Sequence, residues 1–189
     1  MKVIAVLLVT GLTTFASCTK NSDSPQITSG IKGTWNVMYL KRHSIVKDIS
    51  TILGQTLDRT TEISYTTQNT QGTLVISDSL ISVVGLAYTV SSTAFIQQTL
   101  NGEDTTYQTP VVFTVQPINS TARYLLLGSD SMFYPKGFPF TNPDTTGLQK
   151  PSWGTFNLAG DSLVLVQFVN TDPFVFPIIR DTTTIALKR

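Results

Sequence analysis

The fold of this 189-residue chain is decided by the stretch Thr93-Ala94-Phe95-Ile96-Gln97-Gln98-Thr99-Leu100-Asn101-Gly102-Glu103-Asp104-Thr105-Thr106-Tyr107. Its centre, Asn101-Gly102, is a pair that two-residue hairpin turns favour, because both positions need a positive φ. The runs Thr93 to Leu100 and Asp104 to Val115 flank this pair and are rich in residues that favour strands. We therefore predict an antiparallel hairpin here, with Pro110 limiting the pairing of its second strand.

Strand-like runs and short turns continue on both sides of this hairpin. Thr, Ser, Val, Ile, Phe and Tyr are abundant, while Glu62 and Glu103 are the only glutamates. β-Branched and aromatic residues fit a pleated sheet, whereas helices draw on Glu, Lys and Ala. The pattern indicates about eight to ten strands with short connections. We expect an all-β fold, an antiparallel up-and-down barrel of about eight strands, with a β-sandwich as the alternative.

One segment has helical rather than strand periodicity. Between Ser44 and Leu57, apolar residues recur at the spacing that lines one face of a helix. They are Ile45, Ile49, Ile52, Leu53 and Leu57. Ser44 is a suitable N-cap, and Gly54 weakens the last turn. We therefore expect one short helix after the first strand.

Some predicted strands are apolar on both faces. Leu163, Leu165 and Val169 would point one way, and Val164, Val166 and Phe168 the other. An antiparallel sheet with one solvated face should alternate cleanly. Either another element covers the second face, or the strands enclose an apolar lumen, since roughly eight strands can hold one small ligand.

The N-terminus has the features of an export signal. Residues 1–17 combine a positive charge at Lys2 with an apolar run too short to cross a membrane. Phe15-Ala16-Ser17-Cys18 resembles the lipobox of bacterial lipoproteins, where cleavage leaves the cysteine at the new N-terminus to be lipidated. The resemblance implies a signal peptide over 1–17, lipidation of Cys18 and an outer-membrane location in the cell envelope, on either face. The alternative is an ordinary signal peptide followed by a free thiol, a liability in an oxidising compartment.

The remaining chain is expected to form a tether and one domain. Residues 18–30 are polar and aperiodic, which is typical of a flexible tether. Residues 31–189 are long enough for a single β-barrel domain with its own core. The formal net charge of +1 gives no basic footprint for nucleic acid. The partner expected from the tether is therefore a membrane, reached through the lipid.

The start of the domain carries a family resemblance. Gly33-Thr34-Trp35 resembles the Gly-x-Trp motif of lipocalins. In that family the tryptophan plugs one end of an eight-stranded barrel, and an arginine near the C-terminus packs across it. The resemblance implies a lipocalin-like barrel whose end is marked by Gly33, Trp35 and an arginine, for which Arg180 is preferred over Arg189 because a folded segment follows it. Trp153 to Leu165 is similar to a late hairpin of lipocalin-like lipoproteins from gut-commensal Gram-negative bacteria. Alternatively, Trp35 is a core residue of an unrelated sandwich.

A long segment without strand periodicity, residues 129–152, is the candidate contact site. Its aromatic residues, with the tryptophan that follows, are Phe133, Tyr134, Phe138, Phe140 and Trp153. Aromatic side chains dominate small-molecule pockets, and loops of this length are often functional. These residues contact a ligand or partner, or they fold back and plug the barrel end.

Catalytic chemistry is not predicted. His43 is the only histidine and Cys18 the only cysteine, and there is no Gly-x-Ser-x-Gly motif. A catalytic triad, a metal site and a cofactor site therefore lack their usual residues, and His43 is expected to be solvated at the end of the first strand. We expect a non-enzymatic, lipid-anchored protein that binds a small apolar or amphipathic ligand. The alternative is a structural or interaction module that presents its aromatic loop to a protein or glycan.

Within residues 31–189, six aspartates are each followed by Ser or Thr. Turn chemistry explains such pairs, because Asp side chains accept hydrogen bonds from nearby backbone N–H groups. The pairs also resemble the O-glycosylation motif of exported proteins from the same bacterial group. The hydroxyl residues in question are Ser79, Thr105, Ser131, Thr145, Ser162 and Thr182.

Overall fold

The computed structural model describes residues 28–140, 151–171 and 177–189, and within them the fold is all-β, as predicted. A single helical turn, α1 (Thr28–Ile31), precedes the strands. The strands are β1 (Gly33–Ile52), β2 (Gln55–Thr66), β3 (Gln68–Ile76), β4 (Leu80–Leu100), β5 (Glu103–Arg123), β6 (Leu125–Leu127), β7 (Ser131–Tyr134), β8 (Ser152–Ala159), β9 (Ser162–Asn170) and β10 (Ile178–Lys188). The predicted signal peptide, Cys18 and Thr145 lie outside the described residues.

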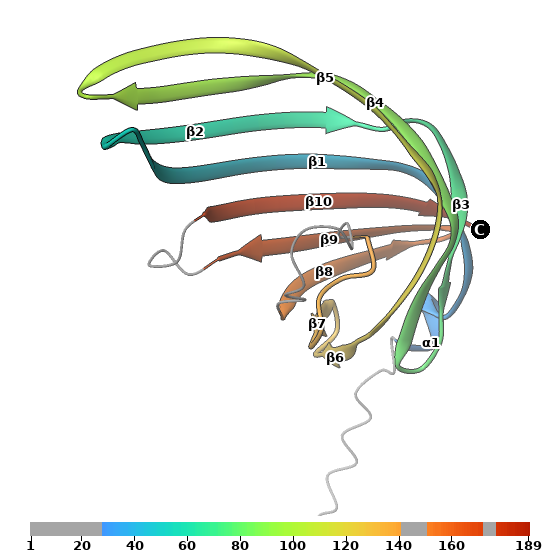
Figure 1. Ribbon diagram of the computed structural model, residues 1–189. Coiled ribbons are helices and arrows are strands. Elements are labelled where there is room, and N and C mark those ends of the chain that lie inside the picture. Colours follow the sequence, from blue (N-terminus) through green and yellow to red (C-terminus); the bar gives the residue numbers. More distant parts are fainter. Residues whose placement is uncertain (1–27, 141–150, 172–176) are drawn as a thin grey trace, which may run out of the picture.

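All ten strands belong to one antiparallel sheet rather than to two (Figure 1). The order is β2-β4-β3-β1-β10-β9-β8-β7-β6, and β5 pairs with β4. The long β1 pairs with β3 near its start and with β2 along its second half, and β4 pairs with the same two strands. Most pairs join consecutive strands, and the exceptions are β1 with β3, β2 with β4 and β1 with β10. Among these described strands, β2 does not pair with β3, nor β5 with β6. The finer prediction of an eight-stranded barrel is not confirmed by this sheet.

The predicted hairpin at Asn101-Gly102 is confirmed. Asn101 has φ +55° and Gly102 has φ +84°, so both turn residues adopt the left-handed conformation that a type I′ turn demands. Leu100 pairs with Glu103, and the ladder runs back to the pair of Leu80 with Arg123. The second strand extends further than expected, because β5 includes Pro110, which is in register with Thr93.

The helix expected between Ser44 and Leu57 is wrong. These residues form the end of β1 and the start of β2, and Leu53-Gly54 is the turn between them. Both turn residues have positive φ, and Ile52 pairs with Gln55 across the turn. The helical spacing is overridden because this part of β1 is β-branched and gains a ladder on each side, with β2 and with β10. Gly54 is thus a turn residue and not a weak last turn of a helix.

The core lies where the start of β1 meets the end of β10. Trp35 is fully buried there, and its indole Nε1–H donates a hydrogen bond of 2.8 Å to the carbonyl oxygen of Ile31. Fully buried non-aromatic side chains of the same cluster include Leu74, Ile81, Leu86, Met132, Leu163, Leu165 and Ile185. They come from β3, β4, β7, β9 and β10, so one apolar cluster includes strands from both sides of β1 in the sheet order.

The other ends of the long strands project beyond this core, where the hairpins β1–β2 and β4–β5 extend away from β6 and β7 (Figure 1). No residue of β2 is buried, and in β5 only Ala122 is. These hairpins are therefore held by ladder hydrogen bonds and cross-strand side-chain pairs more than by burial. The transition between the packed and the projecting halves lies near Leu40. On the inner face of the sheet, which is the face that carries Trp35 and the core, polar side chains begin there.

Candidate functional site

Arg189, and not Arg180, packs against Trp35. The Arg189 guanidinium lies 4.2 Å from the centre of the Trp35 ring. The same guanidinium donates hydrogen bonds of 2.7 and 2.6 Å to the carbonyl oxygens of Gly30 and Lys32. Because β10 runs antiparallel to β1, its last residues lie beside the start of β1, whereas Arg180 pairs with Ile45. The prediction for Arg180 is therefore wrong, although the predicted type of contact is present.

A polar group sits on the inner face just beyond the core. Arg42 on β1 is opposite Thr183 on β10 and opposite Tyr65 on β2, so the three side chains form one cross-strand row. Asp181 lies two residues from Thr183 on β10 and forms an ion pair with Arg42. The Arg42 Nε–H donates a hydrogen bond of 2.7 Å to Asp181 Oδ2. Register therefore brings together two charges that are far apart in sequence.

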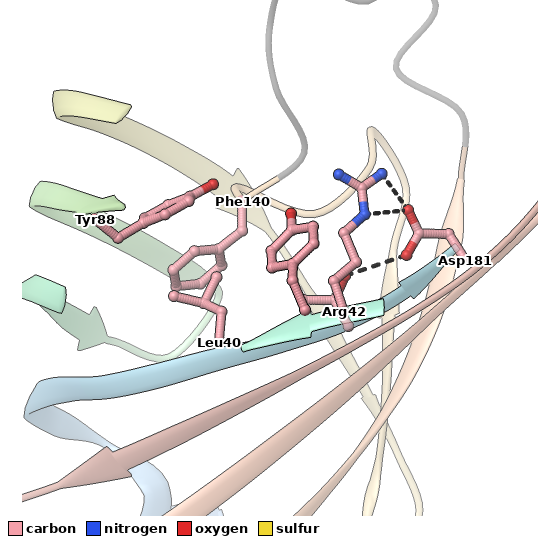
Figure 2. Close-up of a pocket in the computed structure, with 7 residues that line it drawn as sticks. Leu40, Arg42, Tyr88, Phe140 and Asp181 are labelled. Atoms are coloured by element: carbon pink, nitrogen blue, oxygen red, sulfur yellow. Dashed lines mark hydrogen bonds and ion pairs between the residues drawn. The ribbon is translucent and has the colours of Figure 1, made fainter. Parts of the chain in front are cut away.

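Apolar and phenolic side chains complete a small pocket around this ion pair, the Arg42 pocket. Its lining residues are Leu40, Arg42, Tyr65, Tyr88, Phe140, Asp181 and Thr183. Figure 2 shows Tyr88, Phe140 and Leu40 together on one side and Arg42 with Asp181 on the other. The cavity between them has a volume of about 20 Å³, which is room for about one water molecule. The side chains that line the pocket therefore fill most of it.

The protonation of the pocket suits hydrogen bonding. Burial lowers the pKa of Arg42, but its hydrogen bond to Asp181 and the charge of that carboxylate outweigh this effect, so the pKa is raised overall. The pKa of Tyr88 is raised by burial and by Tyr65, against the opposing effect of Arg42. Both groups therefore keep their protons near neutral pH. The pocket combines a neutralised charge pair and a phenol O–H with apolar walls.

The predicted aromatic loop is divided between two faces of the sheet. Tyr134 and Phe138 are buried and meet edge to face, with ring centres 4.7 Å apart. Phe140 stacks on Phe138 at 5.1 Å and reaches the Arg42 pocket. These three residues lie on the inner face of the sheet, and the plug interpretation stays a prediction. Phe133 and Trp153 instead lie on the outer face, with ring centres 4.5 Å apart.

The outer face carries a row of apolar side chains, one on each of β6 to β9, which we call the outer row. Leu125 pairs with Phe133, Phe133 with Trp153, and Trp153 with Phe168. Leu125, Trp153 and Phe168 have exposed fractions of 54%, 55% and 46%. The strands that appeared apolar on both faces are thus explained, since Val164, Val166 and Phe168 face outward, beside this row, and the buried Leu163 and Leu165 face inward.

His43 is not at a strand end, because β1 continues nine residues past it to Ile52. It is half-exposed on the outer face, where its Nδ1 lies 2.8 Å from Ser64 Oγ and 3.9 Å from Glu62 Oε1. A catalytic triad needs the two ring nitrogens to act separately, one on the acid and one on the nucleophile. Both contacts here use Nδ1, so the cluster does not have the geometry of a triad.

The Asp-Ser and Asp-Thr pairs do not all lie at turns as expected. Asp78-Ser79, Asp130-Ser131 and Asp161-Ser162 are at strand connections, and Asp104-Thr105 is near the start of the long β5. The Asp181-Thr182 pair lies inside β10, with Asp181 buried against Arg42. Its aspartate is therefore part of the Arg42 pocket, and the turn interpretation is wrong for this pair. Use of the six hydroxyl groups for glycosylation stays a prediction.

Sequence reasoning missed Arg42, Tyr65, Tyr88 and Asp181 as site residues. Arg42 belongs to the run Lys41-Arg42-His43, which looks like a solvated strand end. A usable signal was that β1 places Leu40 and Arg42 on one face, because side chains two residues apart point the same way. Tyr65 and Asp181 join them only through the ladder partners of β1.

Comparison of the chain with protein-family models, with curated proteins and with solved structures gives no match. Among residues 28–140, 151–171 and 177–189, no cluster of three or more His, Cys, Asp or Glu side chains is placed to hold a metal ion. Within the same ranges, no helix is both long and apolar enough to span a membrane. The features of the described residues that bear on function are the Arg42 pocket, the outer row and the contact between Trp35 and Arg189.

Proposed function

We propose that this chain is a lipid-anchored lipoprotein of the cell envelope whose lipocalin-like domain binds a small amphipathic ligand and catalyses no reaction. The observation that carries the ligand proposal is the Arg42 pocket, where an ion pair and two tyrosines meet Leu40 and Phe140. Small-molecule sites typically join apolar walls to a few convergent polar groups. The anchor is proposed from Phe15-Ala16-Ser17-Cys18 and places the domain at the outer membrane.

The strand pairings support a lipocalin-like barrel. β2 and β3 are separated only by Thr67, whose N–H donates a hydrogen bond to Leu40 O, so they follow one path beside β1. β5 and β6 are separated only by Tyr124. Counting each pair as one strand reduces the ten strands to eight. Because β5 pairs with β4 and β6 with β7, this fourth strand links the two halves of an up-and-down order. The contact between Trp35 and Arg189 adds the lipocalin-type end.

The charge balance of the pocket favours a ligand with a neutral polar head group. Asp181 already neutralises Arg42, so an anionic head group would compete with a buried carboxylate for the guanidinium. A hydroxyl or amide can instead accept from Arg42 or Tyr88 and donate to the Asp181 carboxylate. The apolar part of the ligand would then take the place of Phe140, because the present cavity of about 20 Å³ is too small for it.

Native mass spectrometry of the detergent-solubilised full-length chain, purified from its own host, tests this proposal. We expect a small molecule to accompany the wild-type chain and Lys41→Met, whose side chain leaves the opposite face of β1 one residue from Arg42. We expect the molecule to be lost from the double variant Arg42→Met/Asp181→Leu, and its occupancy to rise in Phe140→Ala, which enlarges the cavity. Equal occupancy in all four proteins, or no bound molecule in any, would contradict ligand binding in the Arg42 pocket.

A second candidate function is an interaction module, and the outer row favours it. The aromatic loop as first predicted does not support this role, because Tyr134 and Phe138 are buried. Phe133 and Trp153 do support it, since they belong to an apolar row that the described residues leave exposed. Soluble monomers rarely expose contiguous large apolar side chains without a use for them.

A further inference from the structure

We propose that the outer face of β6 to β9 lies against the lipid surface to which the chain is anchored, so that the domain rests on the membrane in one orientation. This inference depends on the proposed lipidation of Cys18. It goes beyond that anchor, because it assigns a second contact with the membrane to a face of the folded domain.

The composition of this face favours contact with a lipid surface. A second cross-strand row lies beside the outer row. It contains Leu127 on β6, which has an exposed fraction of 42%, and Val166 on β9. Trp, Phe and Leu side chains of this kind enter the boundary between head groups and acyl chains, where an amphipathic ring such as tryptophan is favoured. The indole of Trp153 lies in the middle of the row and has the largest exposed fraction in it.

The distribution of charge on the outer face also favours contact with a lipid surface. Three cross-strand rows on the outer face of β6 to β10 contain no charged residue. The positions are Leu125, Leu127, Ser131, Phe133, Trp153, Thr155, Asn157, Val164, Val166, Phe168, Thr182, Thr184 and Ala186. The nearest charged strand residues of the same face are basic, namely Lys41 on β1 and Arg180 and Lys188 on β10, and Lys188 forms an ion pair with Asp161 of the turn between β8 and β9. Lys41 and Arg180 are exposed and form no ion pair with a described residue. A neutral apolar face with a basic rim complements an anionic lipid surface.

The length of chain between the anchor and the domain allows the outer row to reach the membrane. Nine residues lie between Cys18 and Thr28, and the ten steps from one to the other span at most about 35 Å. α1 lies beside the far end of β8, because a Cβ at Gly30 would be 2.7 Å from a methyl carbon of Leu158. Trp153 is five residues from Leu158 along the strand, a distance of about 17 Å. The anchor can therefore hold the outer row within reach of the membrane.

Tethering also makes a modest contact sufficient. A single anchored chain meets the lipid surface at a high effective concentration, so docking does not have to overcome the loss of free translation. Four or five apolar side chains can then fix an orientation that they could not maintain from solution. A protein partner receives no such advantage from the anchor, which is why the lipid surface is the favoured occupant.

Tryptophan quenching in vesicles tests the proposal with the protein in its anchored form. The full-length chain is produced in a Gram-negative host that lipidates it and reconstituted into phosphatidylcholine–phosphatidylglycerol vesicles, with or without bromine on the acyl chains. We expect bromine to reduce the emission of the wild-type protein and to leave Trp153→Phe unchanged, because the remaining Trp35 is fully buried. Phe168→Lys should lose the quenching, and Val112→Lys, at an exposed position of β5, should keep it.

Flotation of the same samples separates failure of the anchor from failure of the docked face. A chain that does not float with the vesicles would overturn both the lipid anchor and the inference that depends on it. A chain that floats but shows no bromine quenching of Trp153 would overturn the docked face alone. Protection of Trp153 from aqueous iodide without bromine quenching would show that protein covers the outer row, and would also overturn the proposal. Quenching that survives Phe168→Lys would show that this face is not the one that docks.

Discussion

The guanidinium of Arg189 lies 4.2 Å from the ring centre of Trp35, and it also donates hydrogen bonds to the carbonyl oxygens of Gly30 and Lys32. Arg189 thereby binds to the segment that leads into β1. At its N–H edge the indole donates a hydrogen bond to Ile31 O. The Arg189 side chain thus connects α1, β1 and the end of β10.

The first prediction concerns this contact. Arg189→Ala should lower the free energy of unfolding by about 1–3 kcal/mol, because it removes a cation–π contact and two charge-assisted hydrogen bonds. Arg180→Ala should change it by less than about 0.5 kcal/mol, since Arg180 is exposed. Urea denaturation followed by far-UV circular dichroism measures both. Equal losses in the two variants would contradict the assignment of Arg189 to the tryptophan.

The second prediction concerns Arg42 and Asp181. Asp181→Leu should destabilise the fold by about 2–3 kcal/mol, because it leaves the guanidinium partly buried without its carboxylate. The loss in free energy of unfolding of the double variant Arg42→Met/Asp181→Leu should be smaller than the sum of the losses of the two single variants by at least about 1 kcal/mol. A double-mutant cycle in urea measures this coupling. Simple additivity would mean that the ion pair does not hold β1 and β10 together.

Local sequence was sufficient for the elements whose determinants are local. Asn101-Gly102 specifies its turn because Asn and Gly are the residues that most readily adopt positive φ. The Leu53-Gly54 turn uses the same geometry, with φ of +51° and +80°, but leucine is a poor left-handed residue and gives no such signal. The apolar spacing of Ile45, Ile49 and Ile52 therefore predicted a helix where a hairpin forms.

The candidate site depended on strand register, which single-sequence patterns do not give. Asp181 and Arg42 are 139 residues apart in the chain and meet only because Arg42 is opposite Thr183. The choice between Arg180 and Arg189 has the same basis. Once β10 is antiparallel to β1, the arginine nearest the C-terminus is the one that reaches Trp35. The outer row likewise becomes visible only when β6 to β9 are placed side by side.

The third prediction is a loss of stability in alkali. Burial raises the pKa values of Tyr88, Tyr124 and Tyr134 above their ordinary value of 10.0. Above about pH 10 the unfolded chain releases phenolic protons that the folded chain retains, so the free energy of unfolding falls as pH rises. Below that pH these groups are protonated in both states and have no effect.

Tyr134→Phe isolates the largest of these contributions. The Tyr134 hydroxyl lies 3.0 Å from Met132 Sδ in the core, and its removal should flatten the decline in stability between pH 10 and 11. Tyr107→Phe, at an exposed position of β5, is the matched control and should leave the decline as it is. Urea midpoints measured at several pH values provide the comparison. An unchanged decline in Tyr134→Phe would show that other groups cause the alkaline loss.

The fourth prediction exchanges residues between the two hairpin turns. Leu53 has a positive φ and an exposed fraction of 98%, so it carries left-handed strain and gains almost nothing from burial. Leu53→Asn should raise the free energy of unfolding by about 0.5–1 kcal/mol, and the reciprocal Asn101→Leu should lower it by a similar amount. Leu53→Val should be destabilising, because a β-branched side chain tolerates positive φ least. Chemical denaturation ranks the variants, and a neutral or harmful Leu53→Asn would mean that β1 and β2 are not joined by this turn.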